Sequence, residues 1–171
     1  VWLAKKVDTG ERFAIKQIRR NEKDTREETR ARREALIMAH LRGSCFVLRV
    51  LYTYQNKIDR FLVLDYFEGG SLQTQLEMSY FYDRRKACFA ENRAKFHAAE
   101  ILLALRHMHA RHVCHRDLKL SNVFMKADGH IALGDFGLAR LNVEPHRFPC
   151  HTFCGTVEYL APEILKGEKY G

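Results

Sequence analysis

The chain has 171 residues, of which 46% are hydrophobic and 29% charged, so it has enough apolar side chains for the packed core of one ordinary domain. No run of about 18 apolar residues occurs, and we therefore expect no membrane-spanning helix. The net charge of +8 would suit nucleic acid, but the densest basic run, residues 26–33, alternates with Glu27, Glu28 and Glu34. Such alternation is typical of a solvated helix face, so we expect no nucleic-acid partner.

The five cysteines are odd in number and irregularly spaced. This pattern argues against a disulfide framework and predicts a reducing, intracellular and cytoplasmic compartment. His146, Cys150, His151 and Cys154 have the residue types of a zinc site, but they lack a CxxC pair and a second ligand pair at matching spacing. We therefore prefer ordinary loop thiols to a zinc site.

The first part of the chain predicts a small sheet with one helix. Residues 1–6 and 12–18 alternate apolar and polar side chains around a turn, as a β-hairpin does. Residues 47–54 and 60–67 are two further strand candidates, and residues 25–41 predict a helix with an apolar stripe. The stripe consists of Ala35, Leu36, Met38, Ala39 and Leu41.

Helical periodicity dominates after the break at Gly69-Gly70. A short helix is predicted over residues 71–76 and a long one over residues 90–112, with short strands at 123–125 and 130–133. One face of the long helix is expected to carry Phe96, Ala99, Leu103 and Met108. Strands first and helices later indicate an α+β fold with a smaller sheet-rich part and a larger helical part.

Lys16 is the first candidate for a chemical role, because it follows Phe13, Ala14 and Ile15 on a predicted strand. A lysine in such surroundings is unfavourable to bury unless a negative charge meets it. Glu34 on the predicted helix is the candidate partner, and a triphosphate is a second one. A plain surface lysine is the alternative.

A second group of polar residues follows the long helix. Asp117 lies beside Arg116, which predicts an ionised carboxylate able to accept a proton or to orient a hydroxyl nucleophile. Lys119 can neutralise a transferring phosphoryl group, and Asn122 can ligate a hard cation. Asp135-Phe136-Gly137 adds a carboxylate for a metal ion, a hydrophobic anchor and a glycine that we interpret as a source of mobility.

Four motifs in this order carry a resemblance to a known family. They are Phe-Ala-Ile-Lys at 13–16, His-Arg-Asp-Leu-Lys at 115–119 followed by Asn122, Asp-Phe-Gly at 135–137 and Ala-Pro-Glu at 161–163. In this order and spacing they resemble a protein kinase catalytic domain.

The resemblance implies an α+β, two-lobed protein kinase fold, truncated at both ends. Residues 1–68 would form the small lobe, an antiparallel sheet with one helix, without its Gly-rich loop. Residues 69–171 would form the first part of the mainly helical large lobe through the Ala-Pro-Glu motif.

The same resemblance implies ATP and Mg²⁺ as cofactors and gives each motif residue a role. Lys16, paired with Glu34, would hold the α- and β-phosphates, and Asp117 would be the catalytic base. Lys119 would contact the γ-phosphate, while Asn122 and Asp135 would hold two magnesium ions. The adenine would lie between the apolar side chains of Val1, Ala14 and Phe124, with Leu64 as gatekeeper and the backbone of Asp65 and Phe67 along its edge.

The motifs also resemble serine/threonine kinases rather than tyrosine kinases. Residues 152–163 resemble the AGC group, whereas residues 119–124 and 133–137 resemble polo-like and NIMA-related kinases, which is the assignment we favour. Basic-directed AGC enzymes usually carry acidic residues where this chain has Ser71 and Ser121, which argues against an arginine-directed substrate preference.

The expected activity is ATP-dependent phosphorylation of Ser and Thr hydroxyls in a protein substrate. Thr152 is the candidate activation-loop phosphosite of an upstream kinase, because Arg30, Arg116 and Arg140 could converge on it. Two alternatives stay open: a pseudokinase scaffold that binds without catalysis, and an inactive truncated fragment.

Overall fold

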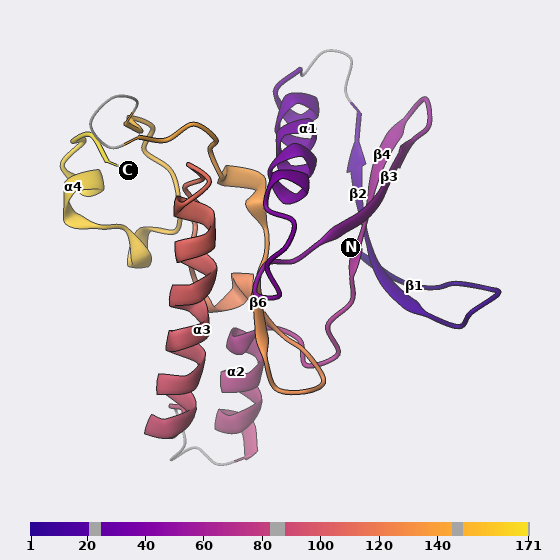
Figure 1. Cartoon of the computed structure of the whole chain (residues 1–171), viewed down its shortest axis with the longest axis horizontal. Helices are drawn as coiled ribbons and strands as arrows, with labels where there is room; N and C mark the ends of the chain where they lie inside the picture. Colours follow the sequence, from indigo (N-terminus) through magenta and orange to yellow (C-terminus); the bar gives the residue numbers. More distant parts are fainter. Residues whose placement is uncertain (21–24, 83–87, 145–148, 171) are drawn as a thin grey trace.

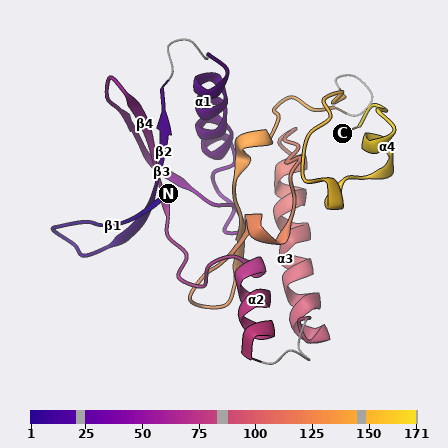
Figure 2. The ribbon, with the colours of Figure 1, turned by 180° about the vertical axis from the view of Figure 1, so that it is seen from behind.

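A computed structural model gives the arrangement of the chain (Figure 1). It describes residues 1–20, 25–82, 88–144 and 149–170. One part consists of a sheet with helix α1 beside it, and the other contains α2, α3 and the later segments, in keeping with the α+β, two-lobed fold expected (Figures 1 and 2).

The larger sheet is antiparallel and has the strand order β1-β2-β4-β3. Its strands are β1 (Trp2–Lys5), β2 (Arg12–Arg19), β3 (Val50–Gln55) and β4 (Asp59–Asp65). The predicted hairpin is confirmed, because β1 and β2 pair with Trp2 opposite Ile15. In β2, Ala14 and Lys16 lie two residues apart and therefore share one face of the sheet.

The strand predicted over residues 47–54 begins later than expected, at Val50. Val47 instead forms a parallel bridge with Leu133, and the Leu48 backbone N–H donates to the Leu133 carbonyl at 2.8 Å. The first residues of the predicted strand therefore connect the larger sheet to β6 (Ile131–Leu133), which pairs with β5 (Val123–Met125) in a second, two-stranded sheet.

Helix α1 (Thr25–His40) agrees with the predicted helix but buries a different set of side chains from the predicted stripe. Leu36 is 64% exposed, whereas Met38 is buried. From residue 29 of α1 through the turn after it, the buried side chains are Ala31, Glu34, Ile37, Met38 and Leu41. Since Glu34 faces inward with these apolar side chains, its carboxylate needs a partner inside the protein.

Helix α2 (Leu72–Tyr82) is longer than the predicted segment 71–76. Ser71 begins it, because the Ser71 hydroxyl accepts a hydrogen bond from the Thr74 backbone N–H at 3.1 Å. Both views place α2 beside the lower part of α3 (Figures 1 and 2), and Arg93 of α3 donates to the Gln75 side chain of α2 at 3.2 Å.

Helix α3 (Glu91–His109) buries Met108 of the face that the apolar pattern predicts, but the rest of its buried face differs. Phe96 and Leu103 are substantially exposed, and the buried side chains are His97, Glu100, Ala104 and Met108. Glu100 can be buried because its carboxylate accepts the Ile131 backbone N–H at 3.0 Å and pairs with His130.

Short elements complete the fold and carry most of the motifs. They are the 3₁₀ turns η1 (Leu120–Asn122), η2 (Phe136–Leu138) and η3 (Val157–Tyr159), and helix α4 (Pro162–Leu165).

All five cysteines are unpaired, and His146 of the candidate zinc group lies outside the described residues. Within the described ranges no helix has the length and apolar character needed to cross a membrane.

Candidate active site

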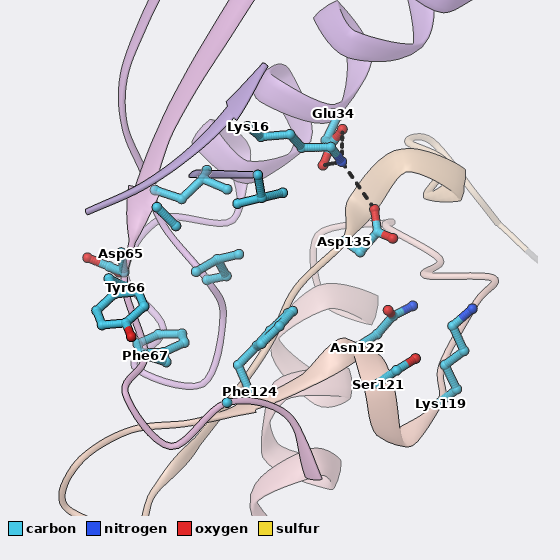
Figure 3. Close-up of a pocket in the computed structure, with 15 residues that line it drawn as sticks. Lys16, Glu34, Asp65, Tyr66, Phe67, Lys119, Ser121, Asn122, Phe124 and Asp135 are labelled. Atoms are coloured by element: carbon cyan, nitrogen blue, oxygen red, sulfur yellow. Dashed lines mark hydrogen bonds and ion pairs between the residues drawn. The ribbon is translucent and has the colours of Figure 1, made fainter. Parts of the chain in front are cut away.

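The Lys16 side chain meets the Glu34 carboxylate, as the sequence predicts. The Lys16 ammonium donates to both carboxylate oxygens of Glu34, at 2.7 and 2.9 Å, and to Asp135 at 3.3 Å (Figure 3). Burial alone would lower the pKa of Lys16, but the two carboxylates outweigh it, so the pKa lies above the ordinary value. Lys16 therefore stays positively charged at neutral pH, and it links β2, α1 and the segment after β6.

Asp135 reaches this ion pair from an unusual backbone conformation. Its φ of 56° and ψ of 74° lie in the left-handed region, which non-glycine residues rarely adopt. Such a conformation costs about 1–3 kcal/mol and persists where surrounding contacts hold it. Phe136, the next residue, is 1% exposed and packs against the His115 ring with a centroid separation of 5.3 Å. The hydrophobic anchor that the sequence predicts is therefore present directly beside Asp135.

Asp117 is surrounded by hydrogen-bond donors. The Thr156 hydroxyl donates to one carboxylate oxygen at 2.7 Å, while Lys119 and Asn122 each contact the other at 3.1 Å. Burial would raise the pKa of Asp117, but the donors outweigh it, so the pKa lies below its ordinary value. The carboxylate is therefore ionised and ready to accept a proton.

The predicted reason for this ionisation is wrong, because the guanidinium of Arg116 does not hold Asp117. Arg116 adopts a left-handed backbone with a φ of 67°, and its Nε donates to the Leu138 carbonyl at 2.7 Å. The Thr156 hydroxyl makes the contact with the Asp117 carboxylate that was expected of Arg116. In the sequence, Thr156 is only one residue of the 152–163 run that resembles the AGC group, and nothing there indicates its contact with Asp117, since 39 residues separate the two.

Asn122 is held in one orientation by Asp117. Its side-chain Nδ2 donates to the Asp117 carbonyl at 2.8 Å and to the Asp117 carboxylate at 3.1 Å. The amide nitrogen is therefore occupied, and the amide oxygen is the atom that can bind a ligand. Oxygen atoms from an amide and a carboxylate are the donors that Mg²⁺ prefers, so Asn122 and Asp135 fit the predicted metal ions.

A cavity of about 560 Å³ brings most of the predicted site residues together (Figure 3). Its predicted lining residues are Val1, Ala14, Lys16, Glu34, Leu64, Asp65, Phe67, Lys119, Asn122, Phe124 and Asp135. Leu48, Tyr66, Gly70 and Ser121 also line it and carried no predicted contact with the nucleotide. Apolar side chains at one end and charged ones at the other make a cavity that suits an aromatic ring joined to phosphates.

Asp117 itself does not line this cavity, and it is joined to it through Lys119 and Asn122. The carboxylate predicted to act as base therefore lies beside the predicted phosphate end of the cavity.

Thr152 borders a second cavity, of about 380 Å³, that is rich in arginine. Arg116 and Arg140 line it as predicted, but the residue that α1 contributes is Arg33 and not Arg30. Arg30 is engaged elsewhere, because its Nε donates to the Gly137 carbonyl at 2.7 Å. The Tyr170 hydroxyl donates to the Thr152 carbonyl at 2.7 Å and so helps to place this threonine.

Comparison with known proteins agrees with this arrangement. The family model described as the protein kinase domain matches residues 1–171. Ribosomal protein S6 kinase beta from Caenorhabditis elegans is 40% identical over 163 residues, covering 92% of this chain and 28% of that protein. Serine/threonine-protein kinase SCH9 from Saccharomyces cerevisiae is 36% identical over 171 residues, covering 98% of this chain and 20% of that protein.

Serine/threonine-protein kinase sck1 from Schizosaccharomyces pombe is 40% identical over 141 residues, covering 82% of this chain and 19% of that protein. The chain thus spans between 19% and 28% of the length of these three relatives. Their names give no support to the polo-like or NIMA-related assignment. The full-length match and the arrangement around Lys16, Asp117 and Asp135 agree, and the chain belongs to the protein kinase domain family.

Proposed function

We propose that the protein containing this chain is a serine/threonine kinase that transfers the γ-phosphoryl group of ATP to hydroxyls of protein substrates. The observation that carries the proposal is the meeting of Lys16, Lys119, Asn122 and Asp135 at one end of a single cavity, with Asp117 beside it. Phosphoryl transfer depends mainly on positioning and charge neutralisation, and this group of side chains supplies both.

Each charged residue has a separate task in this proposal. Lys16, oriented by Glu34, holds the α- and β-phosphates, and Lys119 holds the γ-phosphate. Asn122 and Asp135 would bind Mg²⁺, which when bound neutralises the phosphate charge. Asp117 accepts the proton of the substrate hydroxyl, and its lowered pKa keeps it ionised for that task.

The apolar end of the cavity suits the adenine ring. Val1, Ala14 and Phe124 provide apolar walls, and Leu64, which lines the same cavity, serves as the gatekeeper. The chain from Asp65 to Phe67 runs along one edge of the cavity, where backbone groups can bind the ring (Figure 3).

We assign residues 1–68 to the small lobe and residues 69–171 to the large lobe. The link between them is the segment around Gly69, whose N–H donates to the Met125 carbonyl at 3.1 Å. A Cβ at position 69 would lie 2.7 Å from that carbonyl oxygen, so only glycine allows this close approach.

Phosphorylation of Thr152 by an upstream kinase is the proposed means of activation. The exposed Thr152 borders the cavity lined by Arg33, Arg116 and Arg140. A phosphate at this position would gain charge-assisted hydrogen bonds from these guanidinium groups and would order the loop. Arg116 would then be shared between the phosphate and the Leu138 carbonyl.

The substrate preference is proposed to differ from that of arginine-directed AGC kinases. The Thr-Phe-Cys-Gly-Thr run at 152–156 and relatives such as SCH9 favour the AGC group. However, the two positions that are usually acidic in arginine-directed AGC kinases carry the neutral hydroxyls of Ser71 and Ser121 in this chain. Ser71 caps α2, and Ser121 lines the cavity. A peptide library would therefore yield a consensus without arginines N-terminal to the acceptor.

The test is phosphoryl transfer from ATP and Mg²⁺ to a mixed peptide library by the full-length protein. Transfer to Ser and Thr that is lost in Asp117→Asn would support the proposal, and Thr152→Ala is expected to lower activity to that of the unphosphorylated protein. If the wild type bound nucleotide but transferred nothing, the pseudokinase alternative would replace the proposal. If the wild type neither bound nucleotide nor transferred phosphoryl groups, the alternative of an inactive truncated fragment would be favoured.

A further inference from the structure

Two consecutive carbonyl groups of the turn η2, which follows the left-handed Asp135, each accept a hydrogen bond from an arginine. Arg30 Nε donates to the Gly137 carbonyl at 2.7 Å, and Arg116 Nε donates to the Leu138 carbonyl at 2.7 Å. We call Arg30 and Arg116 the arginine clasp. Arg30 belongs to α1 and Arg116 to the segment before Asp117, so the clasp links this turn to two separate parts of the chain.

The clasp acts next to a backbone that needs support. Asp135 lies in the left-handed region, and an L-residue leaves that region unless other contacts hold it. Only one residue separates Asp135 from Gly137, so fixing the Gly137 carbonyl limits how far the peptide units after Asp135 can rotate. The Asp135 carboxylate is thereby kept within 3.3 Å of Lys16.

Gly137 leaves room for Arg30, which is a different role from the mobility that the sequence analysis assigned to this glycine. A Cβ at position 137 would lie 3.1 Å from both Nε and Nη2 of Arg30 and 3.3 Å from Oδ1 of Asp135. Gly137 is also not among the glycines with positive φ, so its backbone does not require the freedom of glycine. The missing side chain therefore leaves room for the Arg30 guanidinium at the carbonyl and for the Asp135 carboxylate.

We propose that Arg30 is a positioning residue that keeps Asp135 oriented for the metal ion. The inference rests on the proposed function, because it takes Asp135 as a ligand of Mg²⁺. Arg30 acts through the Gly137 carbonyl and does not line the cavity at Thr152, which Arg33 borders instead. Its effect is therefore independent of Thr152 phosphorylation.

The test measures how nucleotide binding by the full-length protein depends on Mg²⁺, with a fluorescent ATP analogue as the probe. In Arg30→Met the Mg²⁺ concentration for half-maximal binding is expected to rise about tenfold, the effect of losing one hydrogen bond from a charged donor. Arg30→Lys, which keeps a charged donor, is expected to recover most of this loss. Arg42→Met, an exposed arginine in the turn after α1, is the control and is expected to match the wild type.

Phosphorylation provides a second readout that separates the role of Arg30 from that of Arg33. Arg30→Met is expected to lower transfer activity by the same factor in the phosphorylated and unphosphorylated proteins. Arg33→Met is expected to reduce the ratio between the two activities, since Arg33 borders the Thr152 cavity.

A double-mutant cycle with Gly137→Ala guards against a simple folding defect. If the alanine acts by displacing Arg30, the double variant Arg30→Met/Gly137→Ala loses clearly less than the product of the two single losses. An Arg30→Met protein with the Mg²⁺ dependence of the wild type would overturn the inference alone. A wild type whose nucleotide binding does not depend on Mg²⁺ would overturn the proposed metal site as well.

Discussion

Replacing Thr156 with valine tests how Asp117 is kept ionised. Valine keeps the branched shape of threonine but removes the hydroxyl that donates to Asp117 at 2.7 Å and accepts from Lys119 at 2.8 Å. Asp117 then keeps only its contacts with Lys119 and Asn122, both at 3.1 Å. The Thr156 hydroxyl makes the shortest of the three contacts to the carboxylate.

The size of the effect follows from this loss. A hydrogen bond to a charged group contributes about 1.5–3 kcal/mol, and each 1.4 kcal/mol corresponds to a factor of about ten in rate. Thr156→Val is therefore expected to lower kcat by roughly 10- to 100-fold. The pKa of Asp117 lies below its ordinary value in part because Thr156 donates to it, so removing the donor raises that pKa. The acidic limb of the pH–rate profile should accordingly move to higher pH.

The assay is the pH dependence of phosphoryl transfer at saturating ATP and Mg²⁺ by the full-length protein. Thr156→Ser is the matched control, because it keeps the hydroxyl and loses only the methyl group, and its acidic limb should coincide with that of the wild type. A Thr156→Val protein with the acidic limb of the wild type would refute the reasoning, as would a Thr156→Ser protein shifted as far as the valine variant.

Two further predictions concern folding. Gly155→Ala should lower the free energy of unfolding by about 1–3 kcal/mol more than Gly43→Ala does. Both glycines have positive φ, but only at position 155 would a Cβ meet backbone, 2.7 Å from the Arg116 carbonyl oxygen, and equal melting temperatures of the two variants would contradict this. Glu100 raises the pKa of His130 through a hydrogen bond, so this pair stabilises the fold fully below the ordinary pKa of 6.5 and loses its effect as pH rises through the raised pKa. Melting temperatures of His130→Gln should therefore approach those of the wild type as pH increases, and a constant gap at all pH values would count against the pairing.

The sequence predicts the order and type of the long elements because their patterns are local. The hairpin of β1 and β2 alternates apolar and polar residues, and α1 begins at the predicted residue, Thr25. The predictions fail where a contact between residues far apart in the sequence determines the local structure. Val47 pairs with Leu133 instead of continuing β3, and the buried face of α3 includes Glu100, which a hydrophobic pattern assigns to solvent. Glu100 is buried because the second sheet supplies its donors.

The motifs likewise predict which residues meet at the cavity but not every bond between them. The pairing of Lys16 with Glu34 could be predicted, since a lysine on an apolar strand needs a carboxylate nearby. The partner of Asp117 could not, because sequence neighbourhood pointed to Arg116 and the chain brings Thr156 to that place. A left-handed backbone at Arg116 directs its guanidinium to the Leu138 carbonyl, and no side-chain pattern signals that conformation.

Two of the left-handed residues, Arg116 and Asp135, would connect catalysis to the proposed regulation. Arg116 holds the turn that follows Asp135 and also lines the cavity at Thr152. A phosphate on Thr152 would therefore share this guanidinium with the Leu138 carbonyl. Arg30, by contrast, lies outside that cavity, where it holds the Gly137 carbonyl and its charge acts on the Glu34 carboxylate. In the proposed mechanism, Arg116 would thus respond to phosphorylation, whereas Arg30 would keep Asp135 in place whether or not Thr152 is modified.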